Sequence, residues 1–213
     1  MITGTGNLSV VSNTSHGPSA FSFDPAGIAG AASTLVTAYP LFYYDNDHET
    51  LGSWSSTAFN SVYTQASMYR GMGIIPNSNT LLVWGHHADE ACYGNGTDDP
   101  ELHGTPWNEE YPYCYDLNGV GVEGVHGYPV KYMFWAYDLR DLAEVKAATM
   151  SYYQPIPYAN WEVTELPIQP SSKMGGGMAV NMSNGDIYVS QYCGYTESTY
   201  CWPIIHKFTV SVP

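Results

Sequence analysis

Two stretches of the chain share one pattern and align without a gap. Gly71–Gly85 aligns with Gly177–Gln191, and each consists of an apolar run, a turn rich in Asn, Ser or Gly, and a second apolar run. This pattern predicts a β-hairpin, and its recurrence indicates a repeat architecture. Each copy is followed by a segment with two cysteines and then by a strand that begins near a proline. The chain therefore predicts about two copies of one all-β unit.

A hairpin with one or two outer strands is typical of a β-propeller blade. Two blades cannot close a propeller, so the chain would be part of a longer protein, its units would be wider than assumed here, or several copies would assemble a ring. An irregular β-sandwich is the alternative fold. We expect a polar lead at residues 1–15 and one all-β domain at 16–213, with units at about 16–125 and 126–213. Helical periodicity is confined to Asp138–Ala148, where Asp138 suits an N-cap.

The charge of the chain excludes some partners. The formal net charge is −14, yet only 12% of the residues are charged and Lys plus Arg number six. Nucleic-acid phosphates require clustered cations, and anionic membranes attract them, so neither partner is expected. No apolar run is long enough for a membrane-spanning helix, so membrane insertion is not expected. A weakly charged polar surface suits a glycan or protein partner, or a cation.

Four cysteines form two local pairs, Cys92 with Cys114 and Cys193 with Cys201. Each pair brackets the segment that follows one hairpin, so two local disulfides are the simplest pairing of the three that four cysteines allow. Zinc ligation is the alternative, although the C-x-x-C spacing of zinc sites is missing. Disulfides indicate an oxidising compartment, so we expect an extracellular or cell-surface protein. The first cysteine pair lies in His86–Gly127, which we interpret as a long insertion after the first hairpin.

Four residues could form a catalytic site: His16, Arg70, His87 and His126. His16 and His126 hold matching places before a Gly in the two units, and equivalent residues of a repeat can converge on one axis. His87 lies beside Asp89, and imidazole next to carboxylate suits acid–base chemistry or a metal. The alternative is that these histidines hydrogen-bond turns and serve the fold.

Aromatic and acidic residues supply the other candidates. Trp107, Tyr111, Tyr113, Tyr195 and Trp202 crowd the two cysteine segments, where exposed rings could stack on sugars or dock a protein. Packing of these rings over the disulfides is the alternative. Asp45, Asp47 and Glu49 alternate like the start of a calcium loop, which makes calcium the expected metal. A solvated acidic surface is the competing interpretation.

Several short motifs resemble a family of large, secreted, propeller-like bacterial proteins of unassigned function. They are Ser15–Ser19, Tyr69–Gly71, Leu82–His87, His126–Pro129, Phe134–Asp138 and Gly185–Gln191, and the similarity extends over most of residues 15 to 210. The family pattern has Arg-His-Gly where this chain has His86, His87 and Ala88. The resemblance implies a secreted propeller-like fold and implies no reaction.

These observations favour a secreted binding or assembly module that engages a glycan or a protein through its aromatic cysteine segments. No known catalytic motif is present, so an enzyme is the less favoured class. The enzymatic alternative is an extracellular polysaccharide hydrolase or lyase with the His/Arg site. A structural subunit of a cell-surface assembly, built as a homo-oligomer, is the third hypothesis.

Overall fold

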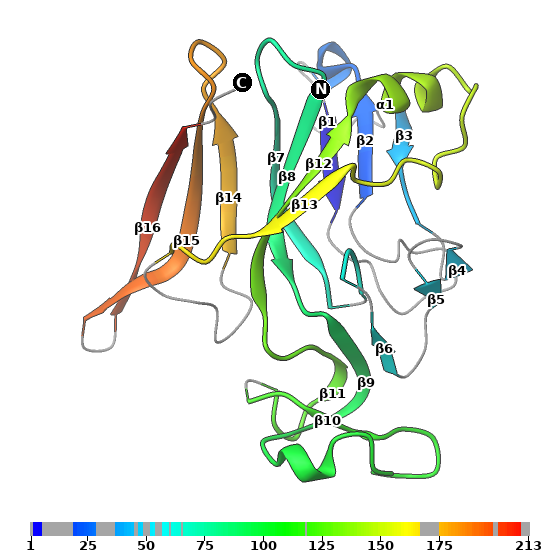
Figure 1. Cartoon of the computed structure of the whole chain (residues 1–213), viewed down its shortest axis with the longest axis vertical. Helices are drawn as coiled ribbons and strands as arrows, with labels where there is room; N and C mark the ends of the chain where they lie inside the picture. The colour runs from blue at the N-terminus through cyan, green and yellow to red at the C-terminus, as the bar shows by residue number, and fades with distance from the viewer. Residues whose placement is uncertain are drawn as a thin grey trace.

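The computed structural model describes residues 2–5, 19–28, 37–44, 47–48, 52–53, 57–59, 61–64, 66–117, 119–166, 175–197 and 200–209. Within these ranges the chain is mainly β-structure, arranged as several open sheets (Figure 1). The strand pairs are antiparallel except that of β10 with β9, which is parallel. The all-β prediction is confirmed at this level, and no sheet of the described part closes on itself.

A four-stranded sheet in the order β13-β12-β8-β7 lies at the centre of the molecule. Its strands are β7 (Met68–Ile74), β8 (Thr80–His87), β12 (Lys131–Asp138) and β13 (Ala159–Glu162). The strands β8 and β12 pair over their full length. Their side chains are buried on both faces because a further sheet covers each face, which explains their nearly continuous apolar sequences.

The first sheet covers one face of the central sheet. It consists of β1 (Ile2–Thr5), β2 (Ser19–Phe23) and β3 (Ala38–Phe42), and the 3-10 helix η1 (Pro25–Ile28) follows β2. Phe42 of β3 stacks on Tyr137 of β12 with ring centroids 4.3 Å apart. The strand β1 lies in the polar lead, which therefore contributes an edge strand to this sheet.

Three buried tyrosine hydroxyls form a chain of hydrogen bonds beneath the first sheet. Tyr44 donates to the carbonyl oxygen of Pro155 at 2.6 Å, so its oxygen accepts from Tyr137 at 2.8 Å. The hydroxyl of Tyr137 in turn accepts from Tyr63. Burial raises the pKa of all three phenols well above the usual value for tyrosine. Each hydroxyl therefore stays protonated and able to donate a hydrogen bond. The chain of bonds ties three separate segments to β12.

The third sheet covers the opposite face of the central sheet and lies at the left of Figure 1. It consists of β14 (Gly175–Val180), β15 (Asp186–Glu197) and β16 (Tyr200–Thr209). The strand β14 approaches β7 so closely that glycine is required there. A Cβ atom on Gly71 would lie 2.4 Å from the backbone nitrogen of Met178, and one on Gly73 would lie 2.5 Å from Val180 Cγ2.

The two predicted hairpins are present, with their turns at equivalent positions. The strand β8 begins at Thr80 and β15 begins at Asp186, which is 106 positions later (186 − 80). The same offset relates Gly71 to Gly177 (177 − 71) in the sequence alignment. In both hairpins a later strand pairs antiparallel with the second strand, β12 with β8 and β16 with β15.

Residues 90–126, the disulfide lobe, extend from the lower end of the central sheet (Figure 1). The lobe contains β9 (Glu90–Thr97), the 3-10 helix η2 (Pro100–Leu102), β10 (Tyr113–Tyr115) and β11 (Glu123–His126). The short strand β6 (Thr57–Phe59) pairs with β9, and β4 (Asp47–His48) pairs with β5 (Gly52–Ser53). The bond Cys92–Cys114 joins β9 to β10, and the bond Cys193–Cys201 joins β15 to β16, so the predicted pairing is confirmed.

The helix predicted after β12 is also confirmed. Helix α1 (Leu139–Lys146) begins after Asp138, whose Oδ1 accepts a hydrogen bond from the Arg140 backbone N–H at 2.8 Å. Such a cap stabilises a helix by about 1 kcal/mol. Leu142 and Val145 are buried, so the helix packs through the amphipathic face that the sequence indicated.

A polar bridge links the central and third sheets. The side chain of Gln191 on β15 donates to the Tyr132 hydroxyl of β12 at 3.3 Å and accepts from His206 Nε2 of β16 at 2.9 Å. Desolvation by burial lowers the pKa of His206 below its usual 6.5. The folded protein therefore favours neutral His206.

This shift predicts a loss of stability on acidification. Between the lowered pKa of folded His206 and 6.5, the unfolded chain binds more protons, so the free energy of unfolding falls as the pH drops through that window. His206→Gln keeps a neutral donor toward Gln191 and removes the titration. We expect wild type to lose more stability than H206Q between about pH 7 and pH 5 in urea unfolding. Parallel pH curves for the two proteins would contradict this effect of burial.

Candidate binding surface on the β15–β16 arm

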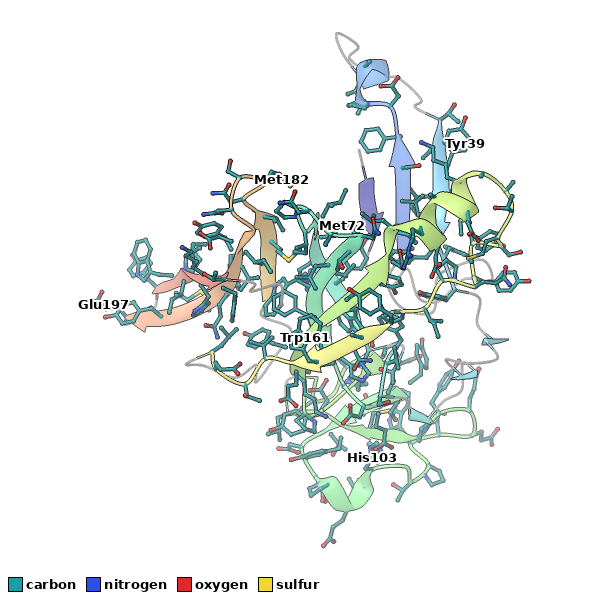
Figure 2. The ribbon with its side chains drawn as sticks, turned by 45° about the horizontal axis from the view of Figure 1, so that its top comes forward. Tyr39, Met72, His103, Trp161, Met182 and Glu197 are labelled. Atoms are coloured by element: carbon teal, nitrogen blue, oxygen red, sulfur yellow. A yellow bond between two sulfur atoms is a disulfide. The ribbon has the colours of Figure 1, made fainter. Side chains whose placement is uncertain are left out.

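The far half of the third sheet extends as a two-stranded arm. The last paired residue of β14 on this side is Gly175, opposite Gln191, so among the described strands only β16 pairs with β15 beyond that point. We define the arm as residues 192–197 and 200–203. Glu197 lies at its outer end, away from the rest of the molecule (Figure 2). An irregularity in pairing between Gln191 and Tyr195, with Cys193 at φ +52°, marks the base of the arm.

One face of the arm is aromatic. Tyr195 lies opposite Trp202, and Glu197 lies opposite Tyr200. Because successive side chains of a strand alternate between faces, these four residues share one face, and directly opposite pairs are close enough to touch. Tyr195 and Trp202 are each 54% exposed and Tyr200 is 69% exposed. The three rings and one carboxylate thus form a solvent-facing surface.

The disulfide stiffens this arm from its other face. Cys201 lies between Tyr200 and Trp202, so its side chain points to the opposite face of the arm. It forms the disulfide with Cys193 there. A cross-link between the strands restricts their relative movement, so the rings are held in place before any partner arrives. Preorganised rings lose less conformational entropy on binding.

The aromatic residues predicted in the disulfide lobe lie elsewhere and are more enclosed. The Tyr111 ring packs edge-on against Tyr93, with centroids 5.2 Å apart, and its hydroxyl donates to Glu110 at 2.6 Å. That bond to a carboxylate raises the pKa of Tyr111 to about 12. Tyr113 is half-buried, and Trp107 is 36% exposed. In Figure 2 this lobe, labelled at His103, is separated from the arm, labelled at Glu197.

His87 lies between Ser67 and Asp89, an arrangement with the same residue types as a catalytic triad. Its Nδ1 bonds to Ser67 Oγ at 2.7 Å, its Nε2 lies 3.2 Å from Asp89 Oδ1, and Asp89 also pairs with Lys131. Ser67 is fully buried, and its oxygen already accepts the Thr64 N–H at 2.9 Å. A nucleophilic serine must reach a substrate, so this arrangement suits a structural role.

His126 is engaged by two oxygen acceptors. Its Nδ1 lies 3.1 Å from Asp116 Oδ2, and its Nε2 lies 2.9 Å from the Val122 carbonyl oxygen. Both partners belong to the segment that precedes β11, and the His126 side chain is buried. A Cβ atom on Gly119 would lie 2.5 Å from His126 Nδ1. His126 therefore links Asp116 and Val122 to β11 through hydrogen bonds, which is a structural role.

The other predicted catalytic and metal residues are placed as follows. Arg70 is exposed at the irregularity of β7 between Tyr69 and Gly71. His16, Asp45 and Glu49 lie outside the described residues, and Asp47 belongs to β4 without a described side chain. The described part of the chain contains no group of three or more His, Cys, Asp or Glu placed to hold a metal ion. The calcium hypothesis thus remains a prediction.

An open pocket of about 520 Å³, called the groove below, is a second candidate surface. Tyr39 of β3, 52% exposed, borders it, together with Lys146 at the end of α1 and Tyr152 and Gln154 beyond the helix. It lies on the opposite side of the central sheet from the arm, as the labels Tyr39 and Glu197 in Figure 2 show. Sequence reasoning missed this groove, because β3 and the end of α1 are distant in the chain.

Sequence reasoning also missed Glu197, although it indicated Tyr195 and Trp202. Glu197 is two positions from Tyr195 on a strand, so the two-residue period alone would have placed them on one face.

Comparison of the chain with protein-family models, curated proteins and solved structures finds no match. Among the helices in the described ranges, none is long and apolar enough to span a membrane.

Proposed function

We propose that this protein is an extracellular, propeller-like binding module that holds a neutral glycan on the aromatic face of its arm. The observation that carries the proposal is the pairing of Tyr195 with Trp202 on a disulfide-linked hairpin, with both rings more than half exposed. Exposed Tyr and Trp rings that present an apolar face and a polar tip suit the C–H faces and hydroxyls of sugars.

The choice of a neutral ligand follows from the charges near the rings. Glu197 is on the aromatic face, and its carboxylate can accept hydrogen bonds from sugar hydroxyls. The chain has a formal charge of −14, which repels acidic polysaccharides. A protein partner is the competing ligand, because exposed Tyr and Trp rings are also frequent at protein interfaces.

The two disulfides support an extracellular location, since such bonds persist in oxidising compartments. The stacking of three antiparallel sheets supports the propeller-like description, since propeller blades stack in that way. Binding is favoured over catalysis because His87 and His126 are buried and bonded to structural partners.

The test is affinity electrophoresis in gels containing a soluble β-glucan, a galactomannan or an acidic pectin. We expect retardation by a neutral polymer, and Trp202→Ala should weaken it about tenfold, which corresponds to about 1.4 kcal/mol. Tyr39→Ala is the matched control, because it removes a half-exposed ring from the separate groove.

Equal retardation of wild type and W202A, or loss with Y39A alone, would place the site elsewhere. No retardation by any neutral polymer, together with W202A-sensitive capture of a purified protein, would assign the arm to protein docking.

A further inference from the structure

The central sheet packs against the third sheet through a face that has a counterpart in the third sheet itself. That counterpart is the outer face of the third sheet, the face turned away from the central sheet. On the central sheet, Gly71 and Gly73 leave room for Met178 and Val180 of β14. The residues 106 positions later are Gly177 and Ala179. Met178 and Val180 point toward the central sheet, so their neighbours Gly177 and Ala179 point away from it. A Cβ atom on Gly177 would meet nothing within 4 Å, whereas its counterpart on Gly71 would collide with Met178.

The rest of this outer face follows from the strand register. Tyr188 lies opposite Lys207, and Ser190 lies opposite Ile205, which is 61% exposed. At the equivalent positions the central sheet has Leu82 opposite Ala136 and Trp84 opposite Phe134, and these side chains contact the third sheet. The outer face thus retains part of the apolar character but has Ser and Lys at two positions. A contact on it would be weaker than the internal one.

The opposite end of the stack presents a complementary surface. In the central sheet, Trp135 and Tyr137 of β12 point toward the first sheet. In the sequence Ser19–Asp24 aligns with Met133–Asp138, so Phe21 and Phe23 of β2 hold the places of Trp135 and Tyr137. Because Ala20 packs in the core between the two sheets, its neighbour Phe21 faces away from the central sheet. Phe21 is half-buried in the chain. The central sheet therefore turns large apolar side chains toward the first sheet, and the first sheet turns Phe21 in the same direction, away from the central sheet.

We propose that the outer face of the third sheet is an interface for a second copy of this chain, which docks there through the outer face of its first sheet. The contact would continue the internal stacking from one copy to the next. It is head-to-tail, so it produces a closed ring or a filament and not a two-fold dimer. This inference is independent of the ligand of the arm. The net charge of −14 opposes association, so added salt should strengthen it.

The test is sedimentation velocity of the full chain from low to high micromolar concentration, at about 0.15 M salt and above. We expect the average mass to rise above 23.4 kDa with concentration. Ile205→Glu should raise the dissociation constant at least about tenfold, since it places a carboxylate in the apolar contact. Val122→Glu makes the same charge change at an exposed site of the disulfide lobe and should leave the mass unchanged. A wild type that stays monomeric, or equal effects of I205E and V122E, would overturn the proposal.

A mixing experiment tests the polarity of the contact. Phe21→Ser removes the docking side chain and leaves the receiving face, while I205E does the reverse. Each variant alone should stay monomeric, and their mixture should give a heterodimer that grows no further. A dimer of I205E alone, or a mixture that contains only monomers, would refute head-to-tail stacking. If circular dichroism shows F21S to be unfolded, the comparison of I205E with V122E decides the question.

Discussion

Replacing Gly71 with alanine is expected to lower the free energy of unfolding by about 3 kcal/mol. The new Cβ atom would lie 2.4 Å from the backbone nitrogen of Met178 and 2.6 Å from its Cβ. Neither atom can move by a side-chain rotation, so β14 would have to shift away from β7. That shift would open the packing between the central and third sheets, where Trp84 and Phe134 are buried. Urea unfolding followed by far-ultraviolet circular dichroism measures the loss.

Gly177→Ala is the matched control for this substitution. It makes the same change at the equivalent place of the second hairpin, where nothing lies within 4 Å of the new atom. We expect a change within about 0.5 kcal/mol, and glycine in a strand is entropically unfavourable, so a slight gain is consistent with the structure. Similar losses for G71A and G177A would contradict the packing of β14 on β7.

Removing the Cys92–Cys114 bond with the double substitution C92A/C114A is expected to cost about 3 kcal/mol. The bond closes a loop with a sequence separation of 22, and both cysteines are buried. Its loss increases the entropy of the unfolded chain and loosens β10 against β9. The unfolding midpoint in urea measures the effect, and an unchanged midpoint would show that the lobe contributes little to global stability.

The double substitution C193A/C201A separates stability from binding. Its loop is shorter, with a separation of 8, so the entropic effect is smaller by about 1 kcal/mol. The arm extends beyond β14, so its loosening should affect the core less than loss of the first disulfide. We expect weaker polysaccharide retardation with nearly wild-type core stability. Full binding by C193A/C201A would mean that the rings do not depend on the cross-link.

Local sequence patterns predicted several elements correctly. The apolar runs around Trp84 and Trp135 became β8 and β12, because a strand covered on both faces needs apolar side chains throughout. Asp138 before an amphipathic segment predicted α1, because an N-cap depends only on residues within one turn. The cysteine pairing followed from short separations along the chain.

Other elements depended on contacts that no local pattern contains. His86–Gly127 read as an insertion, yet it contains β9, whose Gly94 and Gly96 resemble loop residues. Those glycines are required because the carbonyl oxygens of Pro112 and Gly119 approach within 2.0 and 1.9 Å of where a Cβ would be. The histidines looked available for chemistry, but Ser67 and Asp116 engage them from neighbouring segments.

The sequence by itself determined the β-class, the two hairpins, the helix and the disulfides, because period-two alternation, turn residues, capping and cysteine spacing act over short distances. The tertiary structure alone decided which aromatic residues are exposed. Tyr111 and Tyr195 both lie in a segment bounded by cysteines, but the first packs on Tyr93 and the second faces solvent on the arm. Exposure depends on what distant strands bring alongside a side chain, and that arrangement is a property of the packed sheets.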